Sequence, residues 1–270
     1  MKYYLYNPLS NNGILPDLKD GKEWIDATKT DYGKFFRDLK AEDQVVLVGG
    51  DGTINHLVNH VDCASLKNNV YLLANGTGND FLHDIEGKEG EEILLNPYLK
   101  DLPTVTVNGM SRKFINGMGY GIDGYCCETA DRIKEKSPNE KINYTAIAIK
   151  GLLFHFKPCH ATIEVDGKTY EFDHVWLAPT MKGRFYGGGM MVAPAQDRNS
   201  DVLTVVVYMT RSKLKALMAF PSIFEGKHVE KTDIVKVLTG KKIRVRYSRP
   251  CAAQIDGDTV LNVSEYSAEI

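Results

Sequence analysis

The sequence predicts an α/β domain with a parallel sheet, followed by a β-rich antiparallel domain. Up to about residue 104, apolar runs typical of buried strands alternate with segments whose apolar side chains recur at helical spacing. After Pro103, short strands surround Asn-Gly and Asp-Gly dipeptides, which favour tight hairpins. We therefore expect a first domain over residues 1–104 and a second over residues 105–259.

The chain opens with a predicted strand at residues 2–6. This strand ends in a polar, glycine-bearing loop, Asn7 to Gly13. A helical segment is expected next, over residues 34–40, before a second strand at residues 44–48. The order strand, helix, strand predicts that the two strands run parallel.

Residues 45–61 are the most informative part of the chain. The β-branched run at 45–48 leads into Gly49-Gly50-Asp51-Gly52-Thr53, and apolar side chains at 54, 57, 58 and 61 then predict a helix. Glycines at such a turn let the backbone approach a phosphate, and the N–H groups of the helix start face that anion. Asp51 is ordinary as a helix cap, but a carboxylate beside a phosphate also fits a metal ion or a proton transfer.

A third strand is predicted at residues 70–73, again before a glycine-bearing loop. That loop is Asn75-Gly76-Thr77-Gly78-Asn79-Asp80, with Asp80 opening another expected helix. Because the carboxyl ends of parallel strands meet at one edge of a sheet, we expect the three loops to line a single ligand crevice. The alternation predicts one more helical segment, over residues 90–95.

The second half is predicted to be mostly antiparallel. Hairpins are expected around Asn108-Gly109 and Asp166-Gly167, and further strands at 202–209 and 242–247. Helical segments are expected near 125–135, 140–156 and 212–224. The segment from Asn143 to Phe154 is apolar almost all round, which favours a buried or inter-domain helix over one that dips into a membrane.

Composition excludes several classes of protein. A net charge of −2 over 270 residues argues against a dedicated nucleic-acid binder, which is usually basic. Five cysteines without Cys-x-x-Cys spacing indicate neither a zinc site nor a disulfide framework, and they suit a reducing cytoplasm. No run approaches the ~20 apolar residues of a membrane span, and the first residues lack a signal-peptide core. We expect a cytoplasmic protein that meets any lipid from the water side.

Five motifs, taken in order, resemble those of the diacylglycerol/sphingosine kinase-like lipid kinases. They are Asn7-Pro8, Gly49 to Thr53, Gly76-Thr77-Gly78-Asn79-Asp80, Phe185 to Ala195, and Asp256-Gly257-Asp258. The resemblance covers nearly the whole chain, and the soluble bacterial branch matches best in length. It implies an N-terminal fold like that of NAD kinase and diacylglycerol kinase. It also raises the possibility that the final strand, about 260–270, returns to the first domain.

The resemblance further implies transfer of the γ-phosphate of ATP to a lipid hydroxyl such as that of diacylglycerol. Mg²⁺ would be held or oriented by Asp51, Asp80 and Asp256, the first and last of which also count as catalytic candidates. Asp258 would accept the hydroxyl proton, and Asp123 would contact the lipid head group. The expected nucleotide-binding residues are Asn7, Thr28, Gly49, Gly50, Gly52, Thr53, Asn55, Gly76, Thr77, Asn79 and Asp80. Peripheral membrane contact and a homodimer are the expected associations.

The chain departs from the family pattern in several places. Asp258 stands where a glutamate is usual, and its shorter side chain leaves Asp51 as the competing base. Asn11 replaces a frequent glycine, and Ala74 a common proline. Asn199 to Leu203 replaces an Asp-Asp-Gly-x-Leu segment associated with a second metal, so that site is doubtful, although Asp197 and Asp201 remain.

Other interpretations stay open at this stage. Gly119 to Gly124 matches a dinucleotide fingerprint, but no βαβ pattern follows it, so a crowded turn between the domains is preferred. Lys242, Arg244 and Arg246 form a cationic strand face, which fits an anionic lipid or a solvated sheet edge. An NAD kinase-like enzyme shares the Gly-Gly-Asp-Gly loop. A nucleotide-binding protein that has lost its chemistry is the remaining alternative.

Overall fold

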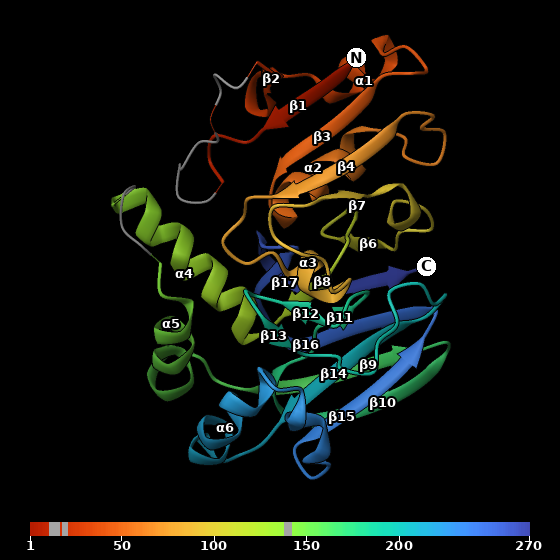
Figure 1. Cartoon of the computed structure of the whole chain (residues 1–270). Coiled ribbons are helices and arrows are strands. Elements are labelled where there is room, and N and C mark those ends of the chain that lie inside the picture. Colours follow the sequence, from red (N-terminus) through yellow and green to blue (C-terminus); the bar gives the residue numbers. More distant parts are fainter. Residues whose placement is uncertain (11–16, 18–20, 138–141) are drawn as a thin grey trace. The chain divides into compact units, whose positions relative to one another are not determined.

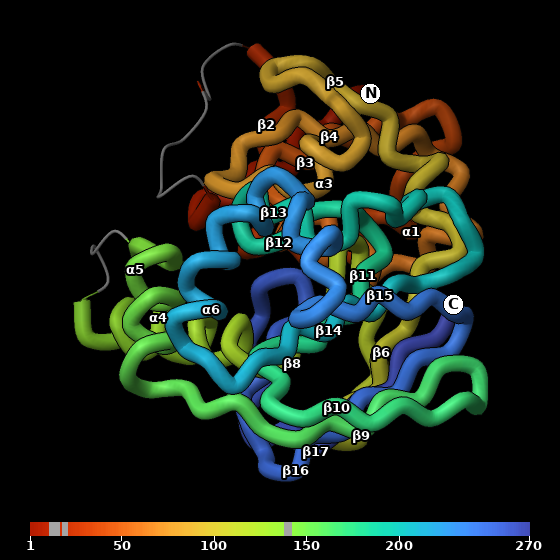
Figure 2. Tube along the Cα trace, turned by 90° about the horizontal axis from the view of Figure 1, so that it is seen from below, coloured from red at the N-terminus to blue at the C-terminus, as the bar shows by residue number. Residues whose placement is uncertain are grey.

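The structure, a computed structural model, describes residues 1–10, 17, 21–137 and 142–270. Asn11 and Gly13 of the first loop lie outside the described residues. The chain divides into two compact units (Figures 1 and 2). The first contains Met1–Leu102 and Phe185–Gly189, and the second contains Pro103–Arg184 and Met190–Ile270.

The first unit is built on a five-stranded sheet of order β2-β1-β3-β4-β5. β1, β3 and β4 pair parallel, as predicted; β2 is also parallel to β1, and β5 is antiparallel to β4. Every side chain from Val45 to Val48 is buried, in keeping with a parallel sheet covered on both faces. The strands are β1 Lys2–Tyr6, β2 Glu23–Asp26, β3 Gln44–Gly49, β4 Asn69–Ala74 and β5 Glu92–Leu94.

The two longer helices of this unit follow a capping aspartate and a glycine. Asp31 caps α1 (Tyr32–Asp38) by accepting from the Lys34 N–H at 2.9 Å. The helix α2 (Asp51–His60) follows Gly50 and buries Ile54, Leu57 and Val58, the apolar positions of the predicted pattern. The helix α3 is the short segment Asp80–Asp84. Two 3₁₀ turns, Ala27–Lys29 and Asn96–Tyr98, complete the unit.

The prediction of a helix at residues 90–95 is wrong. Glu92–Leu94 is the strand β5, because pairing with the open edge of β4 outweighs the alternation on which the prediction rested. The Tyr4 hydroxyl donates to Glu92 at 2.9 Å, which fastens this strand to the sheet. The strand β2 was not predicted; its Trp24 packs on Tyr4 with ring centroids 5.1 Å apart.

In the second unit, all described strands of the large sheet pair antiparallel, as predicted. The sheet order is β7-β6-β17-β16-β8-β11-β14-β10-β9, with β15 on β14. The strands are β6 Thr104–Val107, β7 Met110–Lys113, β8 Gly117–Tyr120, β9 Cys159–Val165, β10 Lys168–Leu177, β11 Thr180–Met181, β14 Leu203–Met209, β15 Val235–Gly240, β16 Lys242–Ile255 and β17 Asp258–Glu269. Two short strands remain: β12 Phe185–Tyr186, which belongs to the first unit, and β13 Met190–Met191, which belongs to the second.

The long strand β16 closes this sheet on itself. Its residues 243–247 pair with β9, whereas its residues 253–255 pair with β8. β16 is therefore an interior strand, which corrects the expectation of a solvated edge. On its outer face, Arg244 and Arg246 both pair with Glu265 of β17, so these two charges are already partnered.

Both predicted hairpins are confirmed, and a third follows the same rule. Asn108-Gly109 and Asp166-Gly167 join their strands with positive φ at both residues, the geometry of a type I′ turn. Asp256-Gly257, with φ of 46° and 97°, joins β16 to β17. This tight turn sends β17 straight back along β16.

The possible return of the final strand to the first domain is therefore not realised. β17 pairs with β16 on one side and with β6 on the other, both within the second unit. The chain instead contributes a different late segment to the first unit, Phe185–Gly189. The sequence did not indicate that exchange.

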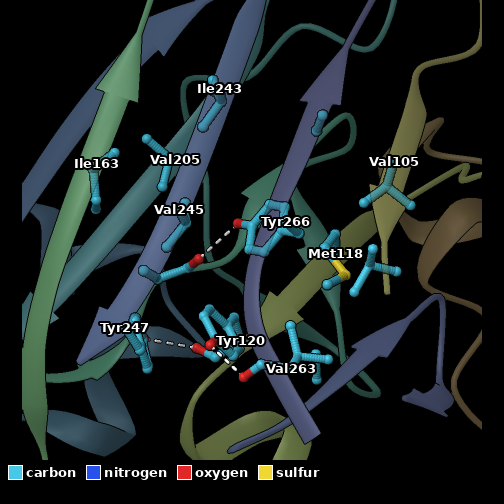
Figure 3. Close-up of a cluster of buried hydrophobic side chains, with 14 of the residues drawn as sticks. Val105, Met118, Tyr120, Ile163, Val205, Ile243, Val245, Tyr247, Val263 and Tyr266 are labelled. Atoms are coloured by element: carbon cyan, nitrogen blue, oxygen red, sulfur yellow. Dashed lines mark hydrogen bonds between the residues drawn. The ribbon is translucent and has the colours of Figure 1, made fainter. Parts of the chain in front are cut away.

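Three tyrosines bind the core of the second unit through their hydroxyl groups (Figure 3). Tyr120 donates to the Val263 carbonyl at 2.6 Å, and Tyr247 donates to the Tyr120 carbonyl at 3.0 Å. Tyr266 donates to the Ala178 carbonyl at 2.9 Å. Burial raises the pKa of all three phenols, so they stay neutral donors.

Helices lie at the three places where the sequence predicts them in this half. They are α4 (Ile122–Lys136), α5 (Tyr144–Lys150) continued by a π-helical turn at Gly151–His155, and α6 (Lys213–Ala219) followed by 3₁₀ turns at Phe220–Ile223 and Lys227–Glu230. No helix among the described residues is long and apolar enough to cross a membrane.

A buried histidine predicts a pH dependence of stability. His228 Nε2 donates to the Val192 carbonyl at 3.0 Å, and burial lowers the pKa of His228 from 6.5. Near pH 6.5 the unfolded chain then binds more protons than the folded one, so the free energy of unfolding falls as the pH drops through 6.5. His228→Gln should reduce this loss in denaturant titrations at pH 5–7.

His160 provides a control of opposite sign. Its bonds to Asp173 and Glu171 raise its pKa, so its contribution is present at low pH and is lost as the pH rises through the folded value. In His160→Gln, the fall in the free energy of unfolding at low pH should be as large as in the wild type or larger. If the free energy of unfolding of His228→Gln fell with decreasing pH as steeply as that of the wild type, the assignment of this pH dependence to His228 would be contradicted.

Candidate nucleotide-binding loops and acidic turn

Three loops leave the first unit's sheet at the same edge. Tyr6 lies opposite Val48, and Gly49 lies opposite Ala74, so β1, β3 and β4 end together. The Asn7 N–H then donates to the Val48 carbonyl at 3.0 Å, and the Asn75 N–H donates to the Gly49 carbonyl at 2.8 Å. The carboxyl edge of the sheet therefore gathers the three loops, as the sequence predicts.

Two of these loops touch through their glycine backbones. A Cβ on Gly50 would lie 2.9 Å from the Gly76 Cα, and a Cβ on Gly76 would lie 2.7 Å from the Gly50 Cα. Real side chains do not tolerate such distances to backbone, so both positions require glycine. A Cβ on Gly49 would meet the Thr53 hydroxyl oxygen at 2.1 Å. Close backbone packing therefore fixes the shape of the Gly-Gly-Asp-Gly-Thr turn.

Asp51 joins the second loop to the third. Its carboxylate accepts from the N–H groups of Asp80, at 2.9 Å, and Phe81, at 2.8 Å. These groups open α3, where N–H donors have no partner within the helix, and the anion also favours the positive end of the helix. Asp51 therefore caps a neighbouring helix that begins 29 positions later in the chain.

Asp80 makes the same kind of contact to a fourth segment. Its carboxylate accepts from the N–H groups of Gly188, at 2.9 Å, and Gly189, at 2.7 Å. Both glycines have positive φ, 82° and 99°, which other residues rarely adopt. Sequence analysis identified this glycine run only as a family motif. The run of consecutive glycines was the one signal in the sequence that two adjacent backbone N–H groups could bind the same acceptor.

Two asparagines fasten the loops from within. Asn79, itself at a left-handed φ of 48°, accepts from the Gly76 N–H at 3.0 Å. Asn7 accepts from the Leu9 N–H at 2.9 Å, and its amide nitrogen donates to the Thr53 hydroxyl at 3.5 Å. Both amides therefore shape loop backbone.

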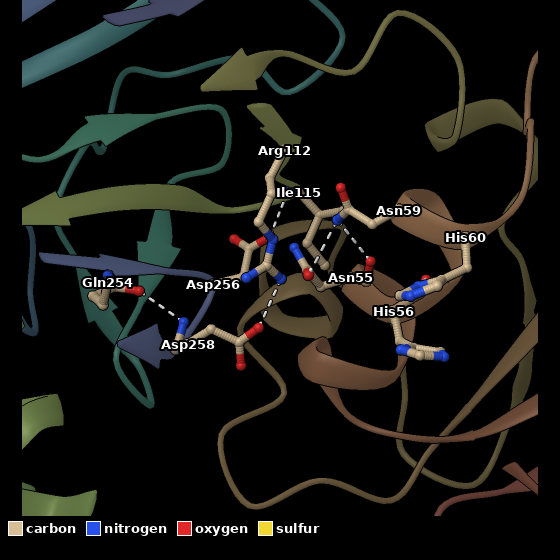
Figure 4. Close-up of polar contacts among 10 residues, drawn as sticks. Asn55, His56, Asn59, His60, Arg112, Ile115, Gln254, Asp256 and Asp258 are labelled. Carbon is tan, nitrogen blue, oxygen red and sulfur yellow. Dashed lines mark hydrogen bonds and ion pairs between the residues drawn. The ribbon is translucent and has the colours of Figure 1, made fainter. Parts of the chain in front are cut away.

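The remaining predicted nucleotide contacts differ in accessibility. Thr28 is exposed after β2, where its N–H and hydroxyl both donate to Asp26, at 2.9 and 2.7 Å. Thr77 is exposed on the third loop. Thr53 and Asn55 are buried in the first turns of α2, and the Asn59 amide donates to the Asn55 side chain at 3.2 Å (Figure 4).

The acidic turn of the second unit has two carboxylates with different surroundings (Figure 4). Asp256 accepts from three successive N–H groups, those of Ile115, Asn116 and Gly117, at 2.7 to 3.0 Å. Asp258 is 61% exposed and pairs with Arg112 at 2.7 Å. Asp256 thus fixes the turn to β8, whereas Asp258 projects from it.

Asp123 lies at the start of α4 and is buried. Its carboxylate accepts from its own following N–H, that of Gly124, at 2.9 Å. A Cβ on Gly124 would lie 2.1 Å from the Ala252 carbonyl oxygen, so this glycine lets α4 pack closely on β16. The Gly119 to Gly124 run is therefore a crowded strand-to-helix turn inside the second unit, and not one between domains.

Among the described residues, no group of three His, Cys, Asp or Glu side chains could hold an ion. Asp51 and Asp80 each accept two backbone N–H groups, and Asp256 accepts three. Of the residues left in place of the family's second metal segment, Asp201 pairs with Lys241 at 2.5 Å. Mg²⁺ therefore stays a prediction, with no set of ligands assigned to it.

Asp51→Asn tests the contact between the Asp51 carboxylate and the N–H groups that open α3. The amide retains one acceptor oxygen but turns an NH₂ group toward a backbone donor, which should lower the free energy of unfolding by about 1–3 kcal/mol. Asp38→Asn is the control, since Asp38 makes an exposed pair with Lys34 and should change stability by less than about 0.5 kcal/mol. If denaturant titrations gave Asp51→Asn and Asp38→Asn the same change in the free energy of unfolding, the role of Asp51 in holding the start of α3 would be contradicted.

Comparison with known proteins finds two family models that meet at residue 117 of this chain. Residues 15–117 match the family model described as the diacylglycerol kinase catalytic domain. Residues 117–267, more than half of the chain, match the model described as the YegS C-terminal NAD kinase beta sandwich-like domain.

Named relatives agree with these models. The chain is 26% identical over 214 residues to a diacylglycerol kinase of Mycobacterium tuberculosis, covering 76% of this chain and 67% of that protein. It is 27% identical over 227 residues to the Bacillus subtilis protein named "Putative lipid kinase YtlR", covering 74% of this chain and 69% of that one. In fold it is similar to a crystal structure of a diacylglycerol kinase from Bacillus anthracis, with a TM-score of 0.66, 19% identity, and coverage of 99% and 93% of the two chains. The chain therefore belongs to the family of diacylglycerol kinase-like lipid kinases.

Proposed function

We propose that the protein transfers the γ-phosphate of ATP to a lipid hydroxyl such as that of diacylglycerol. Membership of the lipid kinase family supports the reaction class. The three loops gathered at one edge of a parallel sheet support binding of a nucleotide there, because ligands of such sheets bind outside the carboxyl ends of the strands. Phosphoryl transfer needs mainly positioning and charge stabilisation, which rigid glycine loops can provide.

Gly52 is the observation that carries the proposal. It is exposed in the first turn of α2, and a Cβ built on it would have no atom within 4 Å. Alanine there would stabilise the helix by about 0.5–1 kcal/mol, so the protein itself gives no reason for glycine. A bound phosphate approaching the helix start would give one.

The other proposed contacts follow from this placement. The loops that carry Gly49, Gly50, Gly52, Thr53 and Gly76-Thr77 would supply backbone and hydroxyl donors to the phosphates. The Thr53 and Gly76 N–H groups already donate within the loops, to the Gly50 carbonyl at 2.9 Å and to Asn79 at 3.0 Å, so these two groups would shape the site. Asp51 and Asp80 would act as braces that keep those donors in place, consistent with their bonds to backbone. Mg²⁺ would then enter with the triphosphate, as it commonly does when proteins supply few ligands of their own.

Asp258 is the proposed proton acceptor for the lipid hydroxyl. It is the more exposed carboxylate of its turn, whereas Asp256 is held by three backbone donors. Asp51, the competing base, has its oxygens engaged at the start of α3. Asp123 is proposed to contact the head group, as the family resemblance implies.

Gly52→Ala separates nucleotide binding from folding. We expect unfolding midpoints equal to or above those of the wild type, together with ATP binding at least about tenfold weaker by calorimetry, since a methyl group would displace the phosphate. Gly50→Ala is the contrast, because it should also lower stability through its clash with Gly76. Undiminished ATP affinity in Gly52→Ala would contradict the proposed phosphate position.

Asp258→Asn tests the proton acceptor. We expect kcat to fall by about 10²–10⁴-fold, the usual worth of general base catalysis, with little change in stability. Asp258→Glu should keep substantial activity, because it restores the family's usual acid. Near-native kcat in Asp258→Asn would eliminate the role.

The acceptor is identified by a panel with labelled ATP. It contains diacylglycerol, monoacylglycerol, ceramide, sphingosine, phosphatidylglycerol and NAD. Transfer to a lipid and none to NAD is the expected result. Transfer to NAD would favour the NAD kinase-like alternative, and ATP binding without any transfer would indicate a nucleotide-binding protein without the chemistry.

A further inference from the structure

We propose that one face of the second unit docks on an anionic lipid bilayer. This docking face consists of Phe154 in the π-helical turn, Leu214 and Met218 on α6, and the cations Lys150, Lys157 and Lys213 around them. The inference deepens the proposed function and rests on it for its purpose, since a lipid kinase must reach a substrate dissolved in a membrane.

On α6, two large apolar side chains are exposed, whereas two alanines of the same helix are buried. Leu214 and Met218, one helical turn apart, are 64% and 67% exposed, whereas Ala216 and Ala219 of the same helix are buried. An ordinary surface helix places its large apolar residues inward. The helix α6 thus presents its larger apolar surface outward, which marks an interaction site.

Phe154 continues the apolar surface from a second segment. It is 73% exposed, although its neighbours Leu152 and Phe156 are buried. The expectation that residues 143–154 form a buried helix therefore holds only for one side of it. Lys213 Nζ donates to the Leu153 carbonyl at 2.7 Å, so α6 and the π-helical turn are fastened together. The helices α5 and α6 lie on the same side of the second unit in Figure 2.

The charge of the two segments identifies the partner. Residues 143–158 and 210–224 contain five lysines and arginines and no aspartate or glutamate, in a chain whose net charge is −2. Lys215 pairs with Asp233, and Arg211 donates to His174, which leaves Lys150, Lys157 and Lys213 as the cations of the docking face. Apolar side chains surrounded by lysines are suited to the interface of an anionic bilayer.

A second copy of the chain fits this face less well. A two-fold dimer would place the same surface against itself, so the lysines of both copies would be gathered at one interface. Like charges brought together at an interface are unfavourable. A bilayer containing phosphatidylglycerol offers the complementary charge.

Vesicle co-sedimentation without ATP tests the docking face. The probe is the full chain with phosphatidylcholine vesicles, with or without phosphatidylglycerol. We expect Leu214→Gln/Met218→Gln and Phe154→Ser each to weaken binding to the anionic vesicles at least about tenfold. The matched control is Val237→Gln/Leu261→Gln, which removes apolar residues 43% and 51% exposed elsewhere on the second unit and should change binding by less than about twofold.

Lysine variants test the electrostatic part of vesicle binding separately from the apolar part. Lys150→Gln/Lys157→Gln should weaken binding to anionic vesicles by about fivefold per charge at low salt and should flatten its dependence on salt. Binding to pure phosphatidylcholine should change little. Circular dichroism and unfolding midpoints verify that each variant is folded.

Two results would overturn the proposal. One is unchanged vesicle binding in Leu214→Gln/Met218→Gln and Phe154→Ser, with the control variant equal to them. The other is a wild-type dimer that these changes convert to a monomer in ultracentrifugation while vesicle binding persists, which would assign the face to a second copy. Because vesicle binding needs no turnover, failure of the proposed kinase reaction would leave this measurement interpretable.

Discussion

The first unit depends on carboxylates that bind backbone N–H groups of distant segments. Asp51 holds the start of α3, and Asp80, which opens α3, holds Gly188 and Gly189. Each contact joins a charged acceptor to two donors, the stronger class of hydrogen bond. Together they fix three segments that are far apart in sequence, so the loops around α3 have a defined shape.

The same principle recurs in the second unit. Asp256 sits in a two-residue turn and accepts from three consecutive N–H groups at the start of β8. The carboxylates of the family's acidic motifs therefore differ: Asp51, Asp80 and Asp256 bind backbone N–H groups, whereas Asp258 is 61% exposed and pairs with Arg112. In both units, buried or half-buried carboxylates hold backbone N–H groups of a neighbouring segment in place.

Much of the fold followed from local pattern. The strands at residues 2–6, 44–48 and 70–73, and the Asn-Gly and Asp-Gly hairpins, were predicted because burial period and turn chemistry are local properties. The errors concern tertiary contacts: β5 depends on pairing with β4, and the placement of β17 depends on its turn. The candidate residues were found as motifs, but their bonding was not, because a sequence does not show that Asp51 reaches Phe81. The exposure of Phe154 and Leu214 was equally hidden, since an apolar residue predicts burial by default.

Hydrogen exchange of backbone amides, with and without ATP, tests the central claim most directly. The account predicts added protection in residues 49–53 and 76–79, where the start of α2 and the third loop would meet phosphate. Gly188 and Gly189, which already donate to Asp80, should gain little. Protection confined to other segments, or none at saturating ATP and magnesium, would contradict the claim that these loops form a triphosphate site.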